Sequence, residues 1–205
     1  DTIDYSTSNI RREVLLISAG SRDGFAGQDP SLLGVGFDNI DKIIGSSSAA
    51  PDILSAASIS NTWRITNNNA GEINALFTFE SFENLNGGSL DDTFILSNQK
   101  GVSGVIDGRA GFDMLDYSAY STAISVNLGS GLATNIVNGI NSIEGVIGTS
   151  VGNTYYGDDS DNILVGGPGN DIIYGYGGND ILTGGGGNDL LDGGTGTDTF
   201  KESDT

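Results

Sequence analysis

The chain has 205 residues, of which 27 are Asp or Glu and 8 are Lys or Arg, so its formal net charge is −19. This charge disfavours nucleic acid and anionic membranes as partners, because both are negatively charged themselves. The chain has no Cys and no His, which excludes a disulfide framework and removes the usual ligands of zinc and copper. No apolar run approaches the roughly 20 residues that span a bilayer, so membrane insertion is not expected.

The N-terminal three quarters of the chain contain a degenerate repetition. DTIDYS (1–6) matches DMLDYS (113–118), and FDNIDKIIGSSS (37–48) matches INSIEGVIGTS (140–150). Residues 1–156 are therefore predicted to form a degenerate parallel β-helix with two related modules, at about 1–60 and 113–156. The first module is longer, and we expect its insertion to carry RDGFAGQDP (22–30) as a surface loop.

The intervening segment, 62–112, alternates apolar stretches with Asn and Gly turns. Strands are predicted at Trp63–Thr66, Ile73–Phe79 and Thr93–Leu96. Coils of about 18 to 22 residues fit these spacings. Stacking such coils would bury the apolar face of each one against its neighbours.

Four nine-residue blocks follow one another without a gap near the C-terminus: GGPGNDIIY (166–174), GYGGNDILT (175–183), GGGGNDLLD (184–192) and GGTGTDTFK (193–201). A weaker block, GDDSDNILV (157–165), precedes them. The glycines allow positive φ and close backbone approach, so the first six residues of a block are expected to turn tightly. The last three are expected to form a strand whose eighth residue points inward, which gives Leu164, Ile173, Leu182, Leu191 and Phe200.

The sixth residue of each block adds a carboxylate to the carbonyls of the turn. An all-oxygen shell of this kind suits a hard cation, calcium above all. The blocks fit the G-G-x-G-x-D-x-U-x nonapeptide of calcium-binding β-helices. On these motifs, residues 157–205 resemble the RTX (repeats-in-toxin) family of secreted bacterial proteins. The resemblance implies an all-β fold, in which the right-handed parallel β-helix continues into a calcium-binding parallel β-roll as one solenoid.

The family resemblance also implies which residues hold calcium. Calcium lies between turns two blocks apart, so Asp171 pairs with Asp189 and Asp180 with Asp198. Asn162 would form a weaker site with Asp180, because it brings one charge fewer. The remaining ligands are implied to be backbone carbonyls near the start of each block: Gly166, Gly167, Pro168, Gly169, Gly175, Gly177, Gly178, Gly184, Gly185, Gly186, Gly187, Gly193, Gly194 and Gly196.

A further calcium site is predicted upstream. GGSLDDTFI (87–95) is another nonapeptide, with Leu90 in place of a glycine and Asp92 at its sixth position. Asp113 occupies the same position of the turn GRAGFD (108–113), one slightly enlarged coil later. The surrounding segment is similar to modules of very large bacterial surface proteins that carry RTX-type repeats. We expect a calcium ion between Asp92 and Asp113.

Other interpretations remain open at this stage. The acidic tail would be disordered without calcium, because its stacked carboxylates repel one another. An enzyme is not expected, since the commonest bases and nucleophiles, His and Cys, are missing. Calcium-dependent polysaccharide lyases also use parallel β-helices with a Lys or Arg base, but no such groove is apparent among the eight basic residues.

The sequence therefore predicts a calcium-binding structural or adhesive segment, folded by external calcium into a rigid rod. We expect it to be secreted, by a type I route, or exposed at the cell surface, and to be a segment of a longer repetitive protein. Beyond calcium, the expected partners are the chain itself, by lateral or end-to-end assembly, or cell-surface polysaccharide. The alternatives are an accessory carbohydrate-binding module of an enzyme and the secretion and folding module of a toxin.

Overall fold

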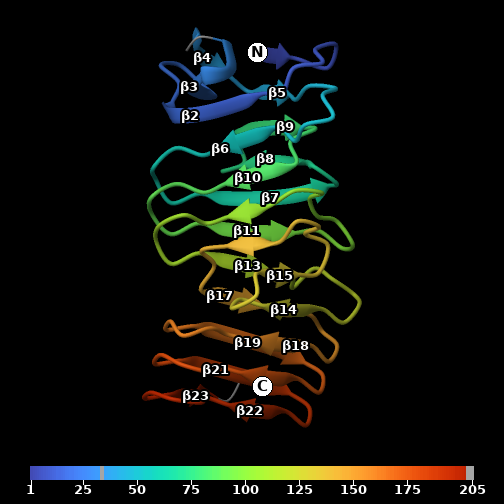
Figure 1. Ribbon diagram of the computed structural model, residues 1–205, viewed down its shortest axis with the longest axis vertical. Helices are drawn as coiled ribbons and strands as arrows, with labels where there is room; N and C mark the ends of the chain where they lie inside the picture. Colours follow the sequence, from blue (N-terminus) through green and yellow to red (C-terminus); the bar gives the residue numbers. More distant parts are fainter. Residues whose placement is uncertain (33–34, 202–205) are drawn as a thin grey trace.

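The computed structural model of the protein describes residues 1–32 and 35–201. The chain forms an elongated rod with its two ends at opposite poles (Figure 1). Within these residues the strands form three sheets, of eleven, seven and five strands. One short 3-10 helix, Pro30–Leu32, interrupts the strands. None of the described helical segments has the length and apolar character needed to cross a membrane.

One sheet, the long sheet, runs the whole length of the rod. In spatial order it contains β1 (Thr2–Asp4), β5 (Lys42–Ile44), β9 (Phe77–Glu80), β8 (Ala70–Ile73), β7 (Thr62–Asn67), β11 (Thr93–Leu96), β13 (Met114–Asp116), β17 (Gly145–Ile147), β19 (Ile163–Pro168), β21 (Ile181–Gly186) and β23 (Thr199–Lys201). Except around β8, which is antiparallel to both its neighbours, these strands pair in parallel.

Two shorter sheets succeed each other along the rod. The upstream sheet contains β16 (Ile140–Asn141), β12 (Ile106–Asp107), β10 (Asn84–Asn86), β6 (Ile53–Ser55), β2 (Glu13–Ala19), β3 (Phe25–Asp29) and β4 (Val35–Ile40). The downstream sheet contains β15 (Leu132–Ala133), β14 (Ser125–Asn127), β18 (Thr154–Tyr156), β20 (Ile172–Tyr174) and β22 (Leu190–Asp192).

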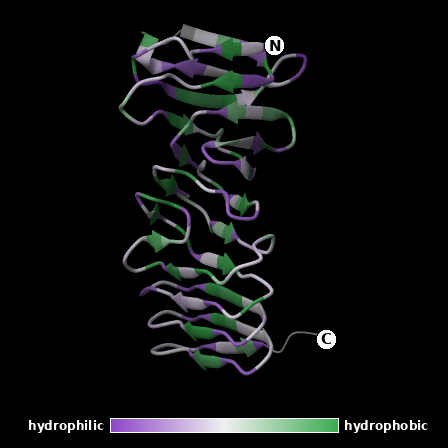
Figure 2. Ribbon diagram, turned by 90° about the vertical axis from the view of Figure 1, so that its right-hand side faces the viewer, coloured by the Kyte–Doolittle hydropathy of each residue, from purple (hydrophilic) through white to green (hydrophobic). Residues whose placement is uncertain are grey.

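The core consists of the inward side chains of these sheets, stacked coil on coil. Along the long sheet, Trp63, Phe94, Leu115, Val146, Leu164 and Leu182 are in successive parallel register and fully buried. Apolar strands and polar turns alternate in the same way down the rod (Figure 2). Each coil buries its apolar face only against its neighbours. The structure thus confirms the predicted all-β parallel solenoid.

The repetition seen in the sequence is also present in the structure. β1 pairs with β5 as β13 pairs with β17, with Ile3 opposite Ile43 and Leu115 opposite Val146. In both copies the DYS turn is closed by a Ser N–H that donates to an Asp side chain two residues earlier, over 2.8 Å. Similar sequence therefore produces the same strand and turn twice, far apart along the rod.

Two sequence predictions in this region were wrong. The segment RDGFAGQDP is not a surface loop, because Phe25–Asp29 forms β3, which pairs antiparallel with β2 and β4. Phe25 is buried and packs edge-on against Phe77, 5.7 Å away, which anchors the strand. Similarly, the predicted strand Ile73–Phe79 is split by a turn. Asn74 and Ala75 adopt φ of 55° and 54° there, so the chain reverses between β8 and β9.

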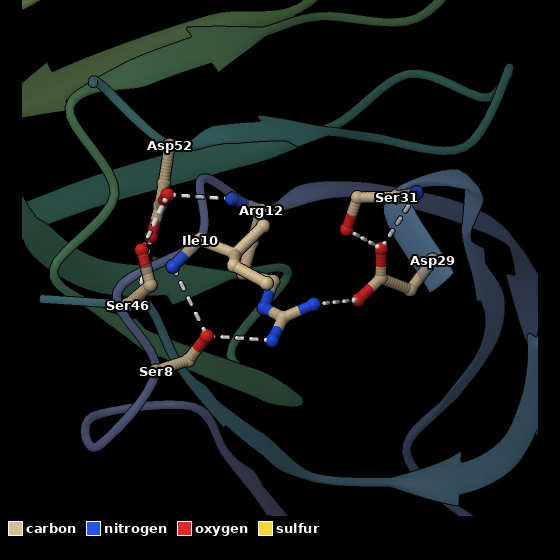
Figure 3. A network of polar contacts seen from close by, with 7 residues as sticks. All are labelled: Ser8, Ile10, Arg12, Asp29, Ser31, Ser46 and Asp52. Atoms are coloured by element: carbon tan, nitrogen blue, oxygen red, sulfur yellow. Dashed lines mark hydrogen bonds and ion pairs between the residues drawn. The ribbon is translucent and has the colours of Figure 1, made fainter. Parts of the chain in front are cut away.

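A buried ion pair holds the first coil to the antiparallel insertion (Figure 3). The Arg12 guanidinium lies 3.9 Å from Asp29 Oδ2, and both residues are buried. Arg12 also donates to Ser8 Oγ over 2.7 Å and covers the Tyr5 ring at 4.4 Å. Burial, with the neighbouring Asp29 carboxylate, raises the pKa of Tyr5 to about 12. We interpret this network as structural, since its groups are directed at one another.

Candidate metal centre: the stacked glycine turns

The turns of the C-terminal blocks share one backbone conformation. Their second position has positive φ: 104° at Gly167, 102° at Gly185 and 87° at Gly194. Their fourth position does too, for example 126° at Gly169. A β-carbon disfavours this region, so the turn calls for glycine at both positions. Tyr176, with φ of 72°, is the exception at the second position.

The first glycine of each block is required for a different reason, which is close approach. A β-carbon on Gly166 would lie 2.4 Å from Asp171 Oδ2 and 2.5 Å from the carbonyl oxygen of Gly184 in the next coil. A β-carbon on Gly175 would likewise lie 2.1 Å from Asp180 Oδ2. The carboxylate of one coil and a carbonyl of the next therefore converge on the same place.

The predicted aspartate pairs are neighbours in this arrangement. The Asp171 backbone N–H donates to Asp189 Oδ1 over 2.9 Å, and that of Asp180 donates to Asp198 Oδ1 over 3.1 Å. Each pair is 18 residues apart, which is one full coil. One carboxylate oxygen thus satisfies a backbone donor of the preceding coil.

In Asp171 and Asp180, Oδ1 likewise accepts a backbone N–H from the preceding coil, but the other carboxylate oxygen, Oδ2, has no such partner. Oδ2 of Asp171 and Oδ2 of Asp180 are buried and accept no hydrogen bond from any described residue. Burial raises the pKa of both carboxyls, and the next carboxylate along the stack, Asp189 or Asp198, raises it further. Buried, unpaired negative oxygens beside carbonyl oxygens form a donor set that fits a hard cation. Acidic side chains alone do not surround such an ion, since no group of three or more occurs among the described residues.

The weaker block, 157–165, has a different turn. Asp158 and Ser160 stay outside the left-handed region, and the Ser160 N–H instead donates to Asp158 Oδ1 over 2.8 Å. Asn162 keeps its place in the stack, since its N–H donates to Asp180 Oδ1 over 2.8 Å. Its amide oxygen accepts the Asp158 N–H instead of carrying a charge. The sixth position therefore contributes no charge in this turn, and the weaker site at Asn162 stays a prediction.

One further block was missed in the sequence. In GTSVGNTYY (148–156), Gly148, Asn153 and Tyr155 occupy the first, sixth and eighth positions. The Asn153 N–H donates to Asp171 Oδ1 over 2.6 Å, so Asn153 lies one coil before Asp171. Tyr155 is buried as the inward residue. The nine-residue spacing was the available signal, but the block lacks most of the glycines and the aspartate.

The same stacking extends to the upstream acidic residues. The Asp92 N–H donates to Asp113 Oδ1 over 2.7 Å, and the Asp113 N–H donates to Glu144 Oε2 over 2.8 Å. Asp113 is fully buried, and its Oδ2 has no partner among the described residues. Burial raises the pKa of Asp113 to about 6, with Asp92 and Glu144 adding to the effect. The structure brings Asp92 and Asp113 together, and calcium between them stays a prediction.

Comparison with known families accounts for the C-terminal part of this geometry. A family model described as the RTX calcium-binding nonapeptide repeat matches residues 147–182, 156–191 and 165–200. Residues 147–200 are RTX calcium-binding repeats. These repeats bind Ca²⁺ and are typical of secreted bacterial proteins. No curated protein matches the chain significantly.

The RTX match starts at residue 147 and so includes the block that was missed in the sequence. It does not include Asp92 and Asp113. In the RTX roll, the ligands implied by the family are the carboxylates of Asp171, Asp180, Asp189 and Asp198 with the turn carbonyls. That assignment of individual ligands remains a prediction, as does the marginal site at Asn162.

Proposed function

We propose that this chain is a rigid structural or adhesive segment of a secreted or cell-surface bacterial protein, folded by external calcium and without catalytic activity. The observation that carries the proposal is the pair of buried, unpartnered carboxylate oxygens on Asp171 and Asp180. Stacked carboxylates repel one another, and bound calcium removes that repulsion. In calcium-poor cytosol the roll would therefore be unfavourable, whereas outside the cell it would fold and stay folded.

The upstream part of the rod supports a spacer role. Its core is continuous across coils, and Trp63 stacks on Phe94 at 5.5 Å and meets Phe79 edge-on at 5.8 Å. Such a core stabilises coils through burial of apolar surface, without relying on metal. The upstream solenoid is thus expected to persist when the RTX roll is unfolded.

A calcium titration that starts in EDTA tests whether the RTX roll needs calcium to fold while the upstream solenoid does not. Trp63 fluorescence reports on the upstream core, whereas far-UV circular dichroism reports on the whole chain, so a change in circular dichroism without a change in Trp63 emission arises outside that core. We expect a cooperative gain of β signal with calcium but not with magnesium, and a largely unchanged Trp63 emission. Full β structure and equal protease resistance in EDTA would argue against calcium-driven folding.

The absence of catalysis is part of the same proposal. It is supported by the lack of His and Cys and by the position of the basic residues. Lys42 and Arg64, for example, are at least partly exposed and lie 2.6 Å and 3.7 Å from Glu80 and Glu72, as ordinary surface ion pairs. A lyase assay that follows unsaturated sugar products at saturating calcium should give no activity. Activity that disappears with one basic residue would overturn this part of the proposal.

Self-association is supported by an exposed aliphatic ladder on the downstream sheet. Ile172 is 39% exposed and lies in register with Leu190, which is 51% exposed. Exposed aliphatic side chains on a parallel sheet favour lateral packing. Sedimentation velocity at saturating calcium should show concentration-dependent association, which the variant Leu190→Lys should weaken. A monomer at all concentrations would exclude assembly through this ladder.

A further inference from the structure

Tyr176 occupies a position at which three neighbouring RTX blocks have glycine. It is the second residue of its block, where Gly167, Gly185 and Gly194 have φ between 87° and 104°. Tyr176 adopts φ of 72°, which is strained for a residue with a β-carbon. Burial does not offset this strain, because the residue is 51% exposed. Arg109 has φ of 74° at the second position of the equivalent turn GRAGFD, so the strain alone does not assign a role, and the surroundings of the Tyr176 ring must do so.

The ring of Tyr176 stacks with two other tyrosine rings. Tyr156 and Tyr174 lie in register on β18 and β20, with ring centroids 5.6 Å apart and ring planes inclined by 6°. The Tyr176 centroid lies 6.3 Å from each of them, with its plane inclined by 19° and 22°. These three near-parallel rings, hereafter the tyrosine platform, come from two blocks one coil apart and from the turn that follows the second.

A recess adjoins the tyrosine platform. It has a volume of about 240 Å³ and is lined by Tyr176, Asn127, Gly129, Gly157, Asp158 and Asp159. This is smaller than the ~300–1000 Å³ of pockets that enclose a drug-sized ligand. The polar groups that line it include two carboxylates and one amide, which accept hydrogen bonds, while Tyr176 adds an apolar ring. The recess therefore suits a small unit rich in hydroxyl donors.

We infer that the tyrosine platform and its recess bind a neutral polysaccharide. The apolar C–H face of a sugar ring packs flat on an aromatic ring, and its hydroxyls donate to carboxylates and amides such as those of Asp158, Asp159 and Asn127. Parallel rings favour a flat ligand over an ammonium group, which is best enclosed by rings on several sides. The net charge of −19 disfavours an anionic polysaccharide.

This inference rests on the proposed calcium-dependent folding, because Tyr174 and Tyr176 belong to RTX blocks. The test therefore measures folding and binding separately, on the full chain at saturating calcium. Binding is measured by isothermal titration calorimetry with cellohexaose, maltohexaose and chitohexaose, and with polygalacturonate as the anionic comparison. We expect at least one neutral oligosaccharide to bind and polygalacturonate not to bind.

Two variants identify the site. Tyr176→Gly removes the ring and the backbone strain, so we expect it to weaken binding about fivefold to tenfold. Its calcium-induced circular dichroism should be unchanged and its melting temperature equal or higher. Tyr176→Phe keeps the ring and should bind like the unaltered chain.

The outcomes distinguish this inference from the proposed function. If calcium fails to induce β structure, the proposed folding mechanism fails before any sugar is added. If the chain folds but no neutral oligosaccharide binds, or polygalacturonate binds instead, the polysaccharide site is refuted while calcium-driven folding stands. If Tyr176→Gly binds normally, or lowers the melting temperature, Tyr176 is a structural residue and the inference is wrong.

Discussion

The Asn153 backbone N–H donates to Oδ1 of Asp171, one coil further along, while Oδ2 of the same carboxylate is buried without a partner among the described residues. One carboxylate therefore has two separate tasks. Oδ1 satisfies a backbone donor that would otherwise be buried unpaired, and Oδ2 remains as a charged ligand. The hydrogen bond is local and metal-independent, whereas the charge of the free oxygen needs compensation. This division supports the proposal that the backbone sets the shape of the roll and that calcium stabilises it.

Replacing one of these carboxylates by an amide should separate the two tasks. In Asp180→Asn the amide oxygen can still accept the Asn162 N–H, but the charge is lost. We expect calcium affinity to fall about tenfold or more, since hydrogen bonds and contacts to charged groups contribute ~1.5–3 kcal/mol. In EDTA the variant should be no less stable, because one repulsive charge has gone. Isothermal titration calorimetry and thermal melts measure the two effects.

Asp159→Asn is the matched control for that experiment. It removes the same charge from the same roll, but Asp159 is exposed and is not among the stacked aspartates. Its calcium affinity should change little, since exposed charges are screened. Equal losses in the two variants would indicate a general charge effect and not a specific ligand.

The pKa of Asp113 predicts an unusual pH dependence in the absence of calcium. Burial raises this pKa from 3.8 to about 6, so between these values the folded chain holds a proton that the unfolded chain releases. Stability is therefore greatest at low pH and decreases as pH rises through about 6. Urea unfolding in EDTA should show a more stable protein at pH 5 than at pH 7. Asp113→Asn should flatten this dependence, and an unchanged slope would exclude Asp113 as its source.

The RTX roll could be predicted well from the sequence, because each position of the nine-residue repeat has a fixed place in the turn or the strand. Leu164, Ile173 and Leu182 are buried as predicted, since the eighth residue of each nine-residue block must point inward when the strands repeat. Phe200, predicted to point inward too, is 56% exposed. Its strand, β23, pairs with β21 alone within the described residues, so nothing described there covers the ring.

The antiparallel excursions could not be predicted in the same way. A strand such as β3 is stabilised by contacts between distant residues, here Phe25 with Phe77, and its segment was predicted as a surface loop because the first module is longer than the second. Likewise, the reversal at Asn74 and Ala75 depends on two left-handed residues that are rarely both non-glycine. The block at Asn153 was missed because an amide replaced the carboxylate while the stacking hydrogen bond survived.

The buried ion pair of the first coil predicts a large and local loss of stability. Arg12→Met would leave Asp29 buried opposite an apolar side chain, which typically costs about 3–5 kcal/mol. Arg22→Met is the control, because it removes the same charge from an exposed residue of the same insertion. Urea unfolding should show a marked shift for the first variant only. If both variants unfold alike, the pair contributes nothing beyond surface charge.

Two adjacent glycines offer the sharpest test of the turn geometry. Gly185 has φ of 102°, and a β-carbon there would lie 2.2 Å from the carbonyl oxygen of Gly167. Gly186 lies outside the left-handed region, and a β-carbon there would meet nothing closer than Pro168 Cα at 3.9 Å. At saturating calcium, Gly185→Ala should lose more than about 1 kcal/mol, whereas Gly186→Ala should be neutral or gain about 0.5 kcal/mol.

The same pair also reports on the metal, because the strain at Gly185 would be relieved only by moving the carbonyl of Gly167, a predicted calcium ligand. Calcium affinity, measured by calorimetry, should therefore fall with the stability of Gly185→Ala and stay unchanged in Gly186→Ala. A stable Gly185→Ala that binds calcium normally would mean that the turn tolerates a β-carbon. The repeated glycine at the second position would then need a different explanation, and Tyr176 would no longer be an outlier.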